Sequence, residues 1–124
     1  FFIPDPKVFW VNSSVKYLHE FLKSNKIDVL ISTGPPHSMH LIAKKIHQKN
    51  NIKWIADFRD PWSDLYYNKG FNQLPFAKNK NIKLETSVLE NADCILTVSN
   101  SLKKQFSKKF LVSFVNLQKL TLCA

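Results

Sequence analysis

Ile27-Asp28-Val29-Leu30-Ile31-Ser32-Thr33 is a short run dominated by β-branched residues, and the turn Gly34-Pro35-Pro36 follows it directly. Such a run, closed by turn residues, predicts a buried β-strand. Residues 53–58 and 94–98 are two further short, largely apolar runs that predict strands. Segments with helical spacing separate the three runs, and this alternation is typical of parallel βαβ units. The sequence therefore predicts an α/β fold, a Rossmann-like parallel sheet with flanking helices.

The helices before and after the first strand are indicated by caps and by apolar spacing. Residues 1–12 are apolar and interrupted by prolines, so we expect them to be irregular. Ser13 or Ser14 can cap a helix that ends near residue 25. The helix after the turn at Gly34 is expected to end near residue 50, because prolines are tolerated in a first helical turn.

The second half of the chain contains a long connection and an atypical end. Residues 60–77 are rich in aromatic residues, Asn, Gly and Pro, and a connection of this length is often functional. A helix ending near Asn91 follows, and after the third strand a short basic helix is expected to reach Lys109. The tail, residues 110–124, fits a last strand or a helix equally well.

The composition limits the classes of protein to which the chain can belong. It has 124 residues, enough for one domain or part of one, and a formal net charge of +9. A solvated lysine surface explains this charge most simply, and a patch facing phosphates or a membrane is the alternative. Cys94 and Cys123 have no framework spacing, which fits a reducing compartment.

Polar residues follow each predicted strand directly. In parallel sheets of this kind, ligands bind outside the carboxyl ends of the strands. The loops at residues 32–37, 57–62 and 98–101 all lie at such ends. The sequence therefore predicts one ligand crevice formed by these three loops.

The second loop contains the single arginine among 18 Lys and Arg residues, Arg59. Its planar guanidinium suits the recognition of paired oxygens, and Asp57 and Asp60 can orient sugar hydroxyls or hold the guanidinium. Trp62 can stack on a sugar ring. The alternative is an Arg–Asp pair that only fixes the loop, with Trp62 in the core.

The first loop places Gly34 where the backbone turns and a ligand can approach closely. His37 lies in the first turn of the following helix, whose free N–H groups favour anions and a neutral imidazole that can accept a proton. The alternative is a histidine that only caps the helix. His37 and His40 supply only two metal ligands, so no metal site is predicted.

The third loop is the least specific. Ser99 is explained most simply as a helix N-cap, and the alternative is a polar loop facing the crevice. The sequence contains no G-x-G-x-x-G, P-loop, G-x-S-x-G or paired C-x-x-C motif, which argues against a self-contained nucleotide, hydrolase or zinc module.

Asp28-Val29-Leu30-Ile31-Ser32-Thr33-Gly34-Pro35-Pro36-His37-Ser38 is followed by Trp54-Ile55-Ala56-Asp57-Phe58-Arg59-Asp60-Pro61-Trp62. Glu90-Asn91-Ala92-Asp93 and Ile95-Leu96-Thr97-Val98-Ser99 come next. In order and spacing these segments resemble the N-terminal half of bacterial family-four glycosyltransferases. The similarity spans about residues 24–109, and the order of the motifs makes it more specific than any single one.

The resemblance implies a GT-B architecture, in which two Rossmann-like domains face a cleft. Residues 1–109 would form an incomplete N-terminal domain that holds the acceptor, with residues 110–124 as an atypical tail. The C-terminal domain, which holds the nucleotide-sugar donor in that family, is not among these residues. The implied activity is retaining transfer of a sugar to a glycan or lipid-linked acceptor, with no metal or other cofactor. Alone, the chain is expected to be inactive.

Carried over from the family, His37 is an active-site residue near the transferring sugar, and Arg59 and Asp60 lie on the acceptor side. The predicted catalytic residue is therefore His37. The predicted substrate-binding residues are Gly34, Asp57, Arg59, Asp60, Trp62 and Ser99. Enzymes of the family are often cytoplasmic and peripheral to the membrane, which the lysine excess suits.

Two other classes of function stay open on the sequence. A small basic α/β module could bind nucleic acid or another polyanion through its lysines and through Tyr66, Tyr67 and Phe71. These aromatic residues cluster in one loop while the lysines lie elsewhere, so no specific nucleic acid is expected. A non-catalytic interaction domain, with its tail as the contact surface, is the third interpretation.

Overall fold

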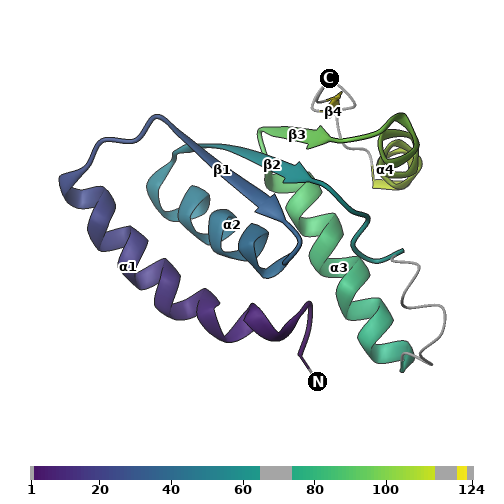
Figure 1. The fold of residues 1–124 in the computed structure, drawn as a ribbon, viewed down its shortest axis with the longest axis horizontal. Coiled ribbons are helices and arrows are strands. Elements are labelled where there is room, and N and C mark those ends of the chain that lie inside the picture. Colours follow the sequence, from purple (N-terminus) through teal and green to yellow (C-terminus); the bar gives the residue numbers. More distant parts are fainter. Residues whose placement is uncertain (1, 65–73, 114–119, 123–124) are drawn as a thin grey trace.

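The chain folds as an open parallel sheet flanked by helices (Figure 1). The computed structural model describes residues 2–64, 74–113 and 120–122, with the backbone alone from residue 110 on. Its strands are β1 (Val29–Gly34), β2 (Lys53–Phe58), β3 (Cys94–Thr97) and β4 (Leu120–Leu122). They lie in the order β1-β2-β3-β4, and each neighbouring pair is parallel. The predicted Rossmann-like α/β fold is confirmed.

The helices alternate with the strands along the chain. A short 3₁₀ helix, η1 (Pro6–Phe9), leads into α1 (Trp10–Ser24), which precedes β1. The helices α2 (Ser38–Asn50), α3 (Pro75–Asn91) and α4 (Asn100–Ser113) each connect two consecutive strands. The predicted ends of the first three α-helices agree with these bounds within about two residues.

The N-terminal segment is more regular than expected. Residues 1–12 were predicted to be irregular, which is wrong for most of this segment, because η1 begins at Pro6 and α1 at Trp10. The carboxylate of Asp5 explains the start, since its Oδ1 accepts a hydrogen bond of 2.9 Å from the backbone N–H of Lys7. Pro6 directly after this cap is compatible with a first helical position.

The main hydrophobic core lies on one face of the sheet. Alternation in β2 sends Trp54, Ala56 and Phe58 to this face, and all three are fully buried. Ile95 of β3 joins them, as do apolar residues of α2, α3 and α4, which are Ala43, Val88, Leu89, Leu102 and Phe106. The opposite face is more open, since Val29 and Ile31 of β1 are exposed.

A second core fills the space between α1 and α2, which lie side by side in Figure 1. Val11 and Val15 of α1 pack there with Ile42 and Ile46 of α2. These four residues have the i, i+4 spacing that places side chains on one stripe of a helix. Helix α1 is therefore held mainly by α2.

The end of the chain contributes to the same sheet. Helix α4 extends to Ser113, beyond Lys109, and Leu120–Leu122 pairs in parallel with β3. The tail thus contains both a helical and a strand segment, while residues 114–119 and 123–124 are not described. In the part of the chain that the structure describes, no helix combines the length and apolar character needed to cross a membrane.

Candidate functional site

The carboxyl ends of β1, β2 and β3 meet at one edge of the sheet. Gly34 is the register partner of Phe58, and Phe58 is the partner of Thr97. The backbone N–H of Arg59 donates a 3.1 Å hydrogen bond to the carbonyl of Gly34, so the first two loops are joined directly after their strands. The register of the strands therefore brings these loops together, as the sequence predicted.

His37 and Trp62 form the centre of this edge. Their rings are nearly parallel, with an interplanar angle of 5° and centroids 4.9 Å apart. His37 is 4% exposed and Trp62 is 2% exposed, so solvent reaches little of either ring. Trp62 lies in the core cluster, as in the alternative left open for it on the sequence.

Gly34 makes room for the histidine rings. A Cβ atom at this position would lie 2.5 Å from Nε2 of His40 and 3.1 Å from Nδ1 of His37. Real Cβ atoms essentially never approach so closely, so any side chain here would displace His40. The close approach expected of a ligand at Gly34 is made in this structure by the protein's own imidazoles.

His40 belongs to a buried polar chain that crosses from β2 to α2. The indole N–H of Trp54 donates to Oγ of Ser32 over 2.9 Å, and this hydroxyl lies 2.8 Å from Nδ1 of His40. Phe58 stacks on the His40 ring with centroids 4.4 Å apart. The hydrogen bond at one edge of the His40 ring and the stacked Phe58 on one face therefore fix the orientation of this ring.

Burial keeps both histidines neutral. Loss of hydration, together with a smaller effect of nearby His37, lowers the pKa of His40 to about 3. Burial also lowers the pKa of His37, although the carboxylates of Glu85, Asp5 and Asp60 oppose this shift. A neutral imidazole at His37 can accept a hydrogen bond or a proton, as the sequence predicted.

Four buried polar atoms at this edge find no hydrogen-bond partner among the described residues. They are Nδ1 and Nε2 of His37, Nε2 of His40 and Oγ1 of Thr97. A buried polar group without a partner typically costs about 1–3 kcal/mol. A polar ligand at the strand ends could supply partners for such groups, provided that the side chains covering them move aside.

The loop after β2 is held by a buried carboxylate, Glu85 of α3. Its Oε1 accepts the backbone N–H groups of Trp62 and Ser63 over 3.2 Å each. Its Oε2 accepts the Ser63 hydroxyl at 2.5 Å and the Lys109 ammonium at 2.6 Å. The indole N–H of Trp62 donates to Oδ1 of Asn81 over 3.1 Å, so α3 fixes both the backbone and the ring of Trp62.

The N-terminus of α2 is occupied by the chain's own carboxylate. Oδ2 of Asp5 accepts the backbone N–H of Ser38 over 2.8 Å, and its Oδ1 accepts the Ser38 hydroxyl over 2.9 Å. The sequence predicted that an anion would be favoured at this helix end. In the structure, Asp5 supplies that anion and ties the N-terminal segment to the turn that carries His37.

The remaining predicted site residues lie apart from the buried rings. Arg59 and Asp60 are exposed, and among the described residues the guanidinium forms no ion pair with Asp57 or Asp60. Asp57 precedes buried Phe58 in β2 and so points to the opposite face of the sheet. The loop therefore does not bring Asp57 to His37.

Ser99 acts as a helix cap. Its Oγ accepts the backbone N–H of Leu102 over 3.1 Å at the start of α4, and its carbonyl accepts the N–H of Lys103 over 3.0 Å. Tyr66, Tyr67 and Phe71 lie outside the described residues. Within the described ranges, no group of three or more His, Cys, Asp or Glu side chains could hold a metal ion.

The sequence reasoning missed two residues that organise the site, Asp5 and Glu85. Glu85 lies four residues after Asn81 and three before Val88, on the buried stripe of α3. An acidic residue in such an apolar stripe is a usable signal, since buried carboxylates need partners. Asp5 gave no comparable signal, because its partner Ser38 is 33 residues away.

Comparison of the chain with protein-family models, with curated proteins and with solved structures found no match. The function must therefore be argued from the residues themselves.

Proposed function

We propose that the chain is the acceptor-binding half of a retaining glycosyltransferase, which transfers a sugar from a nucleotide-sugar to a glycan or lipid-linked acceptor. The donor would be bound by a second domain that these 124 residues do not include. The proposal rests on the motif resemblance described above. The observation that carries it is the cluster of unpartnered polar atoms of His37, His40 and Thr97 at the carboxyl edge of a parallel sheet.

The chemistry of this edge suits a sugar. Sugar hydroxyls both donate and accept hydrogen bonds, so they can satisfy a neutral imidazole and a threonine hydroxyl together. Neutral His37, whose pKa is lowered by burial, would accept a hydrogen bond from a hydroxyl near the reacting centre. The carboxylates of Glu85, Asp5 and Asp60 would stabilise the imidazolium if the ring took up a proton.

Arg59 has a different role in the proposal. Arg59 is exposed, and its backbone N–H donates to the carbonyl of Gly34 at the end of β1. An exposed fork that forms no ion pair among the described residues suits paired oxygens on an acceptor, such as a phosphate or neighbouring hydroxyls. We therefore assign Arg59 to acceptor binding and His37 to the reacting centre.

Arg59→Lys tests this assignment in the protein expressed from its complete coding sequence. Lysine keeps the charge and loses the bidentate fork, so kcat/KM for sugar transfer should fall about tenfold while the unfolding midpoint stays unchanged. Lys104→Arg is the matched exchange on the exposed surface of α4 and should leave kcat/KM unchanged. Full activity in Arg59→Lys would remove Arg59 from the acceptor site.

A peripheral contact with a membrane is part of the same proposal. The net charge of +9 favours anionic surfaces, and a lipid-linked acceptor would be presented at one. We also propose a cytoplasmic location, on the basis of the resemblance and of the spacing of the two cysteines, which fits no disulfide framework.

A further inference from the structure

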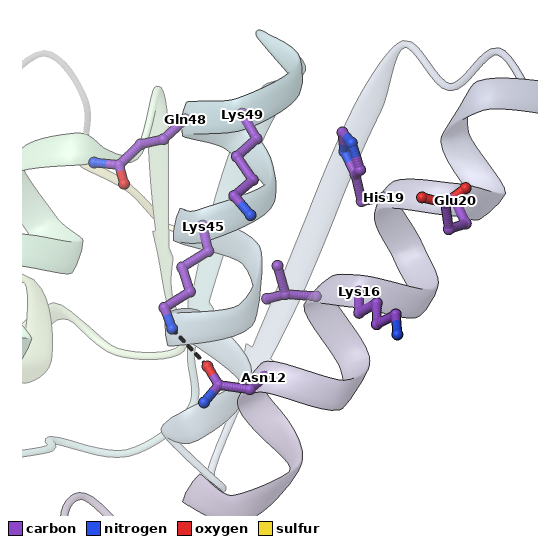
Figure 2. Close-up of a pocket in the computed structure, with 8 residues that line it drawn as sticks. Asn12, Lys16, His19, Glu20, Lys45, Gln48 and Lys49 are labelled. Atoms are coloured by element: carbon purple, nitrogen blue, oxygen red, sulfur yellow. Dashed lines mark hydrogen bonds between the residues drawn. The ribbon is translucent and has the colours of Figure 1, made fainter.

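A second candidate site lies on the other side of α2, in the seam between α1 and α2. It is a groove of about 400 Å³ that opens to solvent (Figure 2). Its two walls come from different helices, which are fixed to each other by the core of Val11, Val15, Ile42 and Ile46. The lining residues are Asn12, Val15, Lys16, His19, Glu20, Lys45, Gln48 and Lys49.

The groove carries an excess of positive charge. Three lysines line it against a single carboxylate, that of Glu20, which is held by Lys23 at 2.8 Å and 2.9 Å. Helix α2 itself contains no acidic residue. Lys45 and Lys49 lie at i and i+4, where like charges repel and destabilise a helix. A bound anion would relieve this repulsion.

The polar groups of the groove are partly fixed in place. The Lys45 ammonium donates a 2.9 Å hydrogen bond to Oδ1 of Asn12, which Figure 2 shows crossing from α2 to α1. Nδ1 of His19 lies 3.1 Å from Oδ1 of Asn50. Val15 is buried at 5% exposure and forms an apolar part of the lining. The groove therefore has shape and donors before any ligand binds.

We propose that this groove binds a phosphate-bearing anion with two or more negative charges, as in a diphosphate or a phosphomonoester. The ammonium groups of Lys45 and Lys49 on α2 and the side-chain amide of Asn12 on α1 supply donors for several phosphate oxygens (Figure 2), whereas the Gln48 amide already donates to Asn91. The volume lies in the range of small-molecule sites, about 300–1,000 Å³, which suits a single phosphorylated group better than a nucleic-acid duplex. The site is separate from the proposed acceptor crevice and does not depend on glycosyl transfer.

The phosphate could belong to a free small molecule or to a lipid head group, and the two sources are separable by experiment. The protein is titrated with inorganic pyrophosphate, and separately with phosphatidylcholine vesicles with and without phosphatidic acid, a lipid phosphomonoester, at about 0.15 M ionic strength. Binding is followed by the NMR signals of the His19 ring and by sedimentation with vesicles. A saturable response to either phosphate source is expected.

Paired variants locate the site. Lys45→Ala/Lys49→Ala removes two charges from the groove, and Lys104→Ala/Lys108→Ala removes the same i, i+4 pair from the exposed surface of α4. The groove variant should lose tenfold or more in affinity, whereas the α4 variant should bind as the parent protein does.

The outcomes are distinct. Saturation by pyrophosphate in free solution identifies a soluble ligand, and a response to anionic vesicles alone identifies a lipid head group; both support the site. No response to either source overturns the proposal. Equal losses in the two paired variants, or binding of single-stranded RNA without any response to pyrophosphate or vesicles, also overturn it, because these results indicate diffuse charge.

Discussion

At the scale of single residues, burial controls the chemistry of the strand ends. His40 is fully buried, and its pKa of about 3 follows from lost hydration. His37 is shifted in the same direction, but the nearby carboxylates limit its shift. Two histidines three positions apart therefore differ in how readily each can take up a proton.

The low pKa of His40 predicts acid sensitivity. The imidazole has a pKa near 6.5 when unfolded and about 3 when folded, so between these values the unfolded chain binds more protons. The free energy of unfolding should fall as pH drops below 6.5, with a loss from His40 of about 2 kcal/mol at pH 5. Urea unfolding of the parent protein and His40→Leu, at pH 7.5 and pH 5, measures this difference. A His40 signal that titrates near pH 6.5 by NMR contradicts the prediction.

Gly34→Ala tests the close contact between β1 and the histidine rings. The added Cβ would lie 2.5 Å from Nε2 of His40, so the substitution should cost about 1–3 kcal/mol of unfolding free energy. In a His40→Ala background the same substitution should cost much less, because the clashing ring is gone. Equal costs in both backgrounds would mean that the contact is not the cause.

These residues also show what the sequence can predict at this scale. A neutral His37 was predicted from the free N–H groups of a helix start, whereas in the structure His37 precedes α2 and burial lowers its pKa. The stacking of His37 on Trp62 was not predicted. That contact depends on how the loop after β2 returns to the sheet. The return is set by Glu85, about two dozen residues further along the chain.

At the scale of elements, side chains of α3 position the loop after β2. Glu85 is fully buried and receives hydrogen bonds from the backbone of Trp62 and Ser63 and from Lys109 of α4. One carboxylate thus connects the loop after β2 to two helices. Removing a buried charge while its partners stay in place strongly destabilises the fold.

Glu85→Gln should lower the free energy of unfolding by about 1–3 kcal/mol, because the Lys109 ammonium loses its buried partner and keeps only the partly exposed carboxylate of Asp64. The matched exchange Glu20→Gln removes an exposed partner of Lys23 and should leave stability nearly unchanged. Urea denaturation of the three proteins at pH 7 gives both values. Similar small effects at both sites would show that the Glu85 network does not stabilise the fold.

The contact between Asp5, at the start of η1, and Ser38 of α2 also joins two elements. Asp5→Ala removes the acceptor for the N–H and hydroxyl of Ser38 and should cost about 1 kcal/mol of stability, as for other helix caps. The pKa of His37 should fall further, since Asp5 opposes its downward shift. An NMR titration of His37 in both proteins checks this. An unchanged pKa would place Asp5 outside the electrostatic environment of the ring.

At the scale of the whole molecule, the strands were easier to predict than the surfaces. Three short apolar runs separated by helical patterns were enough to predict β1, β2 and β3 and a parallel sheet. The fourth strand was not predicted unambiguously from the sequence, because residues 110–124 fit a strand and a helix equally well. Neither the capping of α2 by Asp5 nor the basic groove was predicted, since both need the packing of η1 and α1 against α2.

In the proposed function, His37 lies at the reacting centre of a sugar-transfer site. The most direct measurement is the rate of sugar transfer by the protein expressed from its complete coding sequence, compared among the parent, His37→Ala and His47→Gln. His47 lies in the last turn of α2, away from the crevice, and serves as the matched control. The proposal predicts a loss of about 100-fold or more in kcat for His37→Ala, with native stability, and no loss for His47→Gln. Transfer by folded His37→Ala at the parent rate would contradict it.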